Sequence, residues 1–303
     1  MVIRWLTMRS VVMRSVWHGI VIIACLLLAE SADAQANRGR LFIIGGGKRP
    51  PEMMKQFVDL AGGPAAARIV VIPNASSAPE TTGMEQAEQF RQLGVRSAEY
   101  LLFSREEAMG AAHRLDSATG IFFSGGDQSR LTRDLLHTPV HRKLLELYAR
   151  GAVIGGTSAG AAVMSKVMIT GDELLNPDST NAFSTLKKGN VVTAEGFGFL
   201  STMIVDQHFV RRKRHNRLIS LVLENPSLIG VGIDEATAVV IQPDSMFIVT
   251  GDGQVVVFDA RGASSIHVDR NGNLSAAGVA MHLLSGGDRF DARTGLVLQS
   301  REK

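Results

Sequence analysis

The sequence AVIGGTSAGAA, residues 152–162, runs from apolar residues through a turn of small residues into a helix-forming stretch. The apolar start predicts a strand, and the glycines on both sides of Ser158 allow the chain to turn sharply from that strand into a helix. Small neighbours leave the Ser158 hydroxyl raised above the end of the strand and open to approach. A glycine-rich turn with an N-capping serine is the alternative, but the strand before it and the helix after it favour a nucleophile.

The same alternation of strand and helix recurs on both sides of this unit. Further short apolar runs lie at residues 41–44, 69–72, 120–123, 203–205 and 229–233. Strands that alternate with helices are typical of an α/β fold, in which a mostly parallel sheet is flanked by helices on both faces. Ligands of such a sheet bind outside the carboxyl ends of its strands. We therefore expect the site at the turns that follow these runs.

The sequence after Ala236 changes to closely spaced strands. They are expected at residues 237–241, 246–249, 254–259 and 265–268, with turns at Asp252-Gly253 and Asn271-Gly272. This spacing predicts a β-rich C-terminal extension of the same sheet rather than a second domain. Because no Pro-rich or Ser-rich linker interrupts the chain, we expect one domain over residues 35–303.

The N-terminus has the pattern of an export signal. Arg4, Arg9 and Arg14 precede an apolar run at residues 19–29, and Ala32-Asp33-Ala34 follows as a cleavage site, which predicts a signal peptide over residues 1–34. The apolar run is shorter than the ~18 residues of a membrane span. A lipid anchor at Cys25 is the minor alternative, because Cys25 lies inside the run rather than at its end. We expect export to the periplasm or the medium, with membrane contact only during export.

Composition excludes several kinds of chemistry. Cys25 is the only cysteine, so the mature chain would have no disulfide, no thiol nucleophile and no thiolate metal ligand. The formal charge is +3, and loss of the leader's three arginines and two acidic residues brings it nearer to balance. A partner selected by charge must therefore meet a local patch.

The glycine-rich turn at Gly45–Gly47 does not fit a nucleotide-binding motif. Pro50 stands where a dinucleotide fingerprint has its third glycine, and Arg49 follows Lys48 where a P-loop has Ser or Thr. The sequence predicts a tight strand-to-helix turn here.

A serine nucleophile needs a histidine to take its proton and a carboxylate to orient that histidine. His208 follows the run at 203–205, although a single histidine by itself is more often a surface or core residue. Asp234 and Glu235 both follow the run at 229–233, and the residues alone leave that choice open. The order of serine, histidine and acid differs from that of α/β-hydrolases, which argues against an ordinary esterase or lipase.

Six motifs carry a resemblance to a known family. FIIGGGK, ARIVVIPNASS, GIFFSGGDQSRL, GGTSAGAAVMS, DQHFVRRKRHNRLIS and GIDEATAVV stand in the order found in the serine peptidase family that contains cyanophycinase and, more distantly, aspartyl dipeptidase. The resemblance covers nearly all of the chain after residue 34. It implies a fold similar to class I glutamine amidotransferases, with Ser158 in place of their cysteine.

The same resemblance implies the site residues. The triad would be Ser158, His208 and Glu235, and the amides of Gly126 and Ala159 would form the oxyanion hole. No metal or organic cofactor is implied, and the resemblance implies a homodimer. The residues implied in substrate binding are Gln128, Asp206, Gln207, Arg212, Arg214 and Arg217.

The basic segment 211–217 fits the substrate that the resemblance implies. By itself such a segment indicates a solvated helix face or a nucleic-acid contact, but an exported enzyme rarely meets nucleic acid. Cyanophycin is a polyaspartate with an arginine on each side chain, so it presents carboxylates that guanidinium groups bind well. Its own guanidinium groups need acidic contacts. The sequence does not choose among the candidates Asp127, Asp172, Glu173 and Asp206.

Three functions remain at this stage. The first is a cyanophycinase that releases β-aspartyl-arginine dipeptides, and the second is an exopeptidase on small aspartyl or isoaspartyl peptides. The third is a non-catalytic binding protein on the same fold. The three arginines after His208 favour the first, and the complete set of triad residues disfavours the third.

Overall fold

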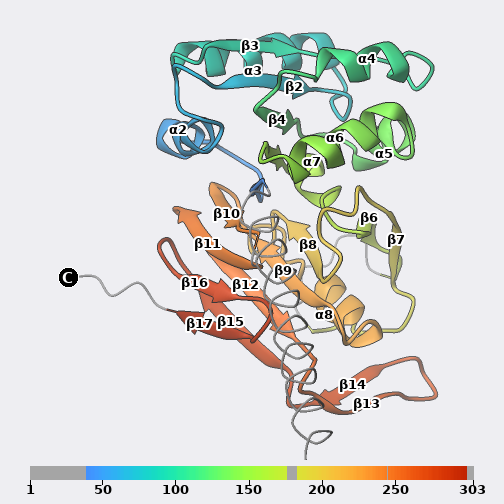
Figure 1. Ribbon diagram of the computed structural model, residues 1–303. Helices are drawn as coiled ribbons and strands as arrows, with labels where there is room; N and C mark the ends of the chain where they lie inside the picture. The colour runs from blue at the N-terminus through green and yellow to red at the C-terminus, as the bar shows by residue number, and fades with distance from the viewer. Residues whose placement is uncertain (1–38, 176–182, 244, 299–303) are drawn as a thin grey trace, which may run out of the picture.

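The computed structural model describes residues 39–175, 183–243 and 245–298. The predicted signal peptide and Cys25 lie outside the described residues. No helix within these ranges is long and apolar enough to cross a membrane. The predicted α/β fold with a β-rich C-terminal region is confirmed (Figure 1).

A nine-stranded sheet forms the centre of the protein, and its parallel strands stand in the order β1-β5-β4-β2-β3. These strands are β1 (Leu41–Ile44), β2 (Arg68–Ile72), β3 (Ser97–Tyr100), β4 (Gly120–Phe123) and β5 (Val153–Thr157). Parallel strands present their carboxyl ends at one edge of the sheet, so the turns after β1, β4 and β5 come together there.

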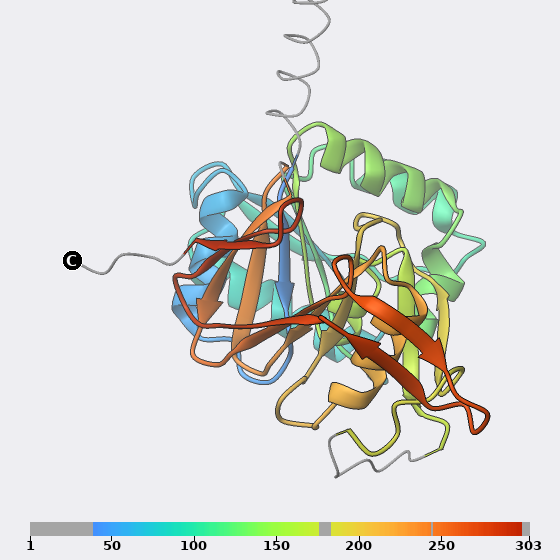
Figure 2. The same ribbon diagram turned by 90° about the horizontal axis from the view of Figure 1, so that it is seen from below.

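Helices cover both faces of the parallel strands, because successive side chains of a strand point to opposite faces. Leu41 and Ile43 pack with α4 to α7, whereas Phe42 and Ile44 pack with α2 and α3. Figure 2 shows α2, in blue, and α6, in green, on opposite sides of the sheet. The helices are α2 (Pro51–Leu60), α3 (Pro79–Gln92), α4 (Ala108–Arg114), α5 (Gln128–Leu135), α6 (Pro139–Ala149) and α7 (Ala159–Ala162).

Antiparallel strands continue the large sheet beyond β1, in the order β10-β11-β16-β17. They are β10 (Thr237–Ile241), β11 (Met246–Gly251), β16 (Arg289–Asp291) and β17 (Leu296–Leu298).

A second sheet has the order β15-β12-β9-β8, and α8 (His215–Glu224) packs against it (Figure 1). Its strands β8 and β9 are parallel, with Gln207 opposite Ile233 at their carboxyl ends. The strands are β8 (Met203–Gln207), β9 (Ile229–Ile233), β12 (Val255–Asp259) and β15 (Ala280–Leu284). Two separate pairs join β6 (Val167–Glu173) to β7 (Val191–Glu195) and β13 (Ser264–Val268) to β14 (Leu274–Ala277).

The prediction that all strands after Ala236 extend one sheet is wrong in part. β12 pairs with β9 in the second sheet, and β13 belongs to a separate hairpin. The runs that form β8 and β9 also lie in the second sheet. β9 is an inner strand because it pairs with β8 on one side and β12 on the other, and Gly232 leaves room there for the ring of Phe209. An apolar run identifies a strand but not its neighbours, so the sequence pattern could not separate the two sheets.

Candidate active site

Ser158 lies at a strained turn between β5 and α7. Its φ is +53° and its ψ is −110°, a conformation that L-residues rarely adopt. The turn brings the backbone of Gly160 close to Gly156, so position 156 has no room for a side chain. A Cβ on Gly156 would lie 2.4 Å from the Gly160 carbonyl oxygen. The Ser158 N–H donates to the Ile44 carbonyl at 3.1 Å, which fixes the turn to the end of β1.

His208 and Glu235 come from the second sheet, directly beyond the parallel strands β8 and β9. The His208 N–H donates to the Gly45 carbonyl at 2.7 Å, and the Ala236 N–H donates to the Gly46 carbonyl at 2.9 Å. Both His208 and Ala236 have a positive φ, near +50°. The backbone at the end of β1 therefore holds these two turns beside Ser158.

The three side chains form a hydrogen-bonded row. His208 Nε2 lies 2.9 Å from Ser158 Oγ, and His208 Nδ1 lies 2.7 Å from Glu235 Oε1. The neighbouring Asp234 instead accepts a hydrogen bond from the Arg211 N–H, so Glu235 is the acid next to the imidazole. Chemically, this row allows the serine proton to move to the histidine while the carboxylate balances the new charge.

Gly46 and Gly47 provide the space that this row needs. A Cβ on Gly46 would lie 2.3 Å from His208 Cε1, and one on Gly47 would lie 2.8 Å from Glu235 Cβ. The sequence predicted only a tight turn at these glycines and missed this role. Three glycines in succession were the available signal, but the residues that approach them lie far away in the sequence.

The two predicted oxyanion-hole amides belong to the turns after β4 and β5. Ala159 follows Ser158 at the start of α7, and Gly126 belongs to the turn after β4. A Cβ on Gly125 would lie 3.4 Å from Ser158 Cβ, so this turn borders the serine. No residue in the described ranges accepts a hydrogen bond from either N–H group. Their role in binding an oxyanion stays a prediction.

The electrostatic environment keeps the imidazole neutral. Burial lowers the pKa of His208 below its usual 6.5, the hydrogen bond with Glu235 opposes this, and the positive charge of Arg212 lowers it further. The hydrogen bond from His208 lowers the pKa of the Glu235 carboxyl. At neutral pH the row therefore consists of a neutral base and an ionised carboxylate.

Several residues predicted to bind substrate are buried or partly buried and bind other groups of the protein. Arg217 is 3% exposed and its Nε donates to Asp206 Oδ2 at 2.7 Å, while Asp206 is 1% exposed. Arg214 donates to the backbone carbonyl of Gln207 at 2.8 Å. The Gln128 side-chain amide donates to two carbonyls of β6. Direct substrate contact by these residues stays a prediction.

Arg212 differs from these residues because its side chain is exposed. Within the described part of the chain it makes no ion pair, and its charge acts on His208. Arg212 is therefore the member of the predicted arginine set that is most open to a substrate carboxylate.

Three of the predicted acidic contacts for a substrate guanidinium already accept hydrogen bonds within the protein. Asp127 caps α5 by accepting from the Ser129 N–H at 2.8 Å, and Glu173 is buried and accepts from Asn190 at 2.9 Å. Asp206 is bound by Arg217. The side chain of Asp172 lies outside the described residues. Asp127 is exposed, and its direct contact with a substrate guanidinium stays a prediction.

A serine hydroxyl, an imidazole and a carboxylate in a row at the strand ends of an α/β sheet define the class of serine hydrolases. The comparisons with known proteins narrow this class. Residues 41–249 match the model of peptidase family S51. The chain belongs to this family, and it is a serine-type peptidase.

Relatives and a solved structure agree with this family. The chain is 38% identical over 270 residues to a cyanophycinase from Synechococcus elongatus, covering 85% of this chain and 80% of that protein. It is 35% identical over 272 residues to a cyanophycinase from Trichormus variabilis, covering 86% and 88%. The crystal structure of a peptidase from an acI-B1 Actinobacterium shares the fold, with a TM-score of 0.61 and 23% identity, covering 85% of this chain and 98% of that one.

We predict that Gly46→Ala lowers kcat by about a hundredfold, because the new methyl group displaces the His208 ring from Ser158. Gly63→Ala is the matched control, since Gly63 also has a positive φ but has nothing within 4 Å of an added Cβ. Steady-state kinetics and thermal unfolding of both variants measure the effect. Equal activities of the two variants would show that the space at Gly46 does not matter.

The pKa shifts predict the pH profile of kcat/KM. A neutral His208 is the active base, so activity should fall on the acid side with a midpoint below 6.5. Arg212→Gln removes a charge that lowers the His208 pKa, so the midpoint should move to higher pH. Lys213→Gln removes the same charge from a residue that does not contribute to this shift. An acid limb that stays in place in Arg212→Gln, or moves to lower pH, would contradict this assignment.

Proposed function

We propose that this protein is an exported cyanophycinase. It would hydrolyse the aspartyl backbone of cyanophycin and release β-aspartyl-arginine dipeptides. The observation that carries the proposal is the Ser158-His208-Glu235 row, with its 2.9 and 2.7 Å hydrogen bonds, in a chain related to cyanophycinases over most of its length. The basic, apolar start of the sequence supports export, although it lies outside the described residues.

In the proposed mechanism, Ser158 Oγ attacks the scissile carbonyl carbon while His208 Nε2 takes the serine proton. Glu235 accepts the Nδ1–H and stabilises the imidazolium that forms. The amides of Gly126 and Ala159 bind the carbonyl oxygen as it becomes an oxyanion. The imidazolium then protonates the leaving amine as the C–N bond breaks, which leaves an acyl group on Ser158.

The second half of the reaction uses the same groups. His208 takes a proton from water as the water oxygen attacks the acyl carbon, and the C–O bond to Ser158 breaks. The proton then returns to Ser158 Oγ, and the free acid leaves. No further proton carrier is needed in either half.

Substrate recognition in this proposal divides the basic residues into two groups. Arg212 is exposed next to His208, which supports direct contact with a carboxylate of the polymer. The buried pair of Arg217 and Asp206 supports a role in positioning His208, because Asp206 lies on β8 two residues before His208. Gln128, Gln207 and Arg214 would shape the floor of the site.

Two other functions would give different results with the polymer and with small peptides. An exopeptidase would cleave small aspartyl peptides but leave the polymer intact. A binding protein would retain the polymer without turnover, although the complete hydrogen-bonded row favours catalysis. Assembly as a homodimer stays a prediction.

We predict that Ser158→Ala lowers turnover of purified cyanophycin by on the order of a thousandfold or more, and that Glu235→Gln lowers it less. Ser227→Ala, at an exposed serine, is the control. Polymer solubilisation and mass identification of the products measure the reaction. The proposal fails if the wild-type protein leaves the polymer intact, or if Ser158→Ala keeps wild-type turnover.

A further inference from the structure

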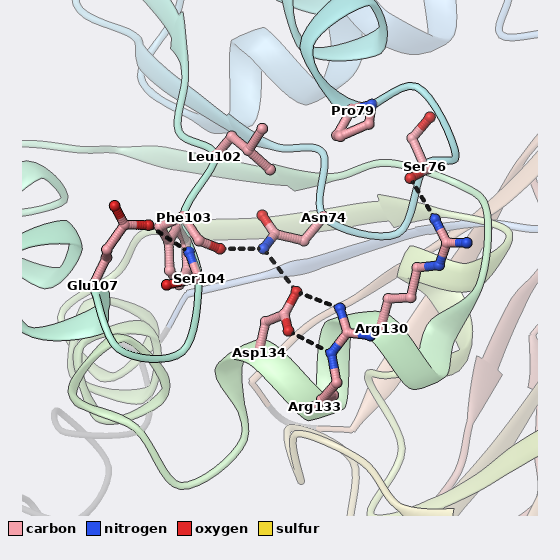
Figure 3. Close-up of a pocket in the computed structure, with 10 residues that line it drawn as sticks. All are labelled: Asn74, Ser76, Pro79, Leu102, Phe103, Ser104, Glu107, Arg130, Arg133 and Asp134. Carbon is pink, nitrogen blue, oxygen red and sulfur yellow. Dashed lines mark hydrogen bonds and ion pairs between the residues drawn. The ribbon is translucent and has the colours of Figure 1, made fainter.

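A cavity lies to the side of the candidate active site, over the carboxyl ends of β2 and β3 (Figure 3). Its volume is about 550 Å³, within the range of small-molecule sites. The loops after β2 and β3 and one face of α5 form its walls. We call this cavity the Asn74 pocket, with the lining residues Asn74, Ser76, Leu102, Glu107, Arg130 and Asp134.

Asn74 presents a buried acceptor that lacks a partner. The residue is 5% exposed, and its Nδ2 donates to the Phe103 carbonyl at 2.7 Å and to Asp134 Oδ2 at 3.1 Å. Both partners accept only, which fixes the orientation of the amide. Asn74 Oδ1 has no hydrogen-bond partner among the described residues, and it points toward the side of the pocket where Leu102 and Pro79 lie (Figure 3). This oxygen exposes less than 1 Å² of surface, so it is enclosed in the wall of the pocket.

The pocket also contains two charges that the described part of the chain does not neutralise. Arg130 Nη1 donates to the Ser76 carbonyl at 3.0 Å, and Glu107 Oε2 accepts from the Ser104 N–H at 2.8 Å, but neither makes an ion pair there. Arg133 and Asp134 differ, because they pair with each other at 2.7 Å. Figure 3 shows Glu107 and Arg130 on opposite sides of Asn74. This arrangement suits a ligand with a positive group at one end and a carboxylate at the other.

The pocket is separated from Ser158 by a thin wall. The Asp127 N–H donates to the Ala75 carbonyl at 2.9 Å, and a Cβ on Gly126 would lie 2.0 Å from the same oxygen. β2 and β3 stand two and three strands from β5, so the pocket lies roughly 10–14 Å to the side of the nucleophile. About three or four residues of extended polypeptide span that distance.

We propose that the Asn74 pocket is a distal subsite for the polymer. It would bind an arginine-bearing side chain about three or four backbone residues from the scissile bond. Arg130 would bind the free carboxylate of that arginine, and Glu107 would accept from its guanidinium group. This inference rests on the proposed function and deepens it.

The test compares substrates that can and cannot reach the pocket. The probes are synthetic oligomers of the β-aspartyl-arginine dipeptide, one of two units and one of roughly eight units. Arg130→Gln and Glu107→Gln should each raise KM for the long oligomer by about tenfold or more, because each removes a charge-assisted contact. KM for the short oligomer should change far less. Arg142→Gln, which removes a charge from an exposed position on α6, should leave the ratio of the two KM values unchanged.

The outcomes distinguish a failure of the proposed function from a failure of the proposed subsite. A wild-type enzyme that cleaves neither oligomer overturns the proposed function and the subsite with it. A wild-type enzyme that cleaves both, with variants that alter both KM values equally or neither of them, overturns the subsite alone. The turnover number on the short oligomer reports whether each variant is folded, since a misfolded variant would lose activity on both.

Discussion

The site depends on three successive carbonyl groups at the end of β1. Ile44, Gly45 and Gly46 accept hydrogen bonds from the backbone N–H groups of Ser158, His208 and Ala236. Ser158 follows a strand of the large sheet, whereas the other two follow strands of the second sheet. One short backbone segment therefore joins the two sheets and sets the spacing of nucleophile, base and acid.

The same bonds offset strain at the site. Ser158, His208 and Ala236 all have a positive φ, which costs on the order of 1 kcal/mol each or more. Residues in such conformations persist where their surroundings over-determine them. Here the backbone bonds, the register of β8 with β9, and the buried Arg217–Asp206 pair supply that constraint. The glycines of the turn after β1 are also required, because a larger residue would leave no room for the imidazole.

The sequence predicted features whose signals are local. The parallel strands, the turn at Ser158 and the β-rich end each rest on a short pattern, and the structure has all three. Features that depend on distant neighbours could not be predicted. The pattern did not show that β12 pairs with β9, that Gly46 faces His208, or that Arg217 is buried against Asp206. The Asn74 pocket was missed for the same reason, since its walls come from two loops and one helix that are separate in the sequence.

The central claim is that the end of β1 holds Ser158 and His208 as a reactive pair. The most direct measurement is covalent labelling with a serine-directed fluorophosphonate, followed by trypsin digestion and mass spectrometry of the peptide 151–166. This peptide also contains Ser165, a buried serine that donates no proton to a histidine and serves as an internal control. The account predicts rapid labelling at Ser158 alone, lost in His208→Ala. Labelling at another serine, or an equal rate in His208→Ala, would contradict it.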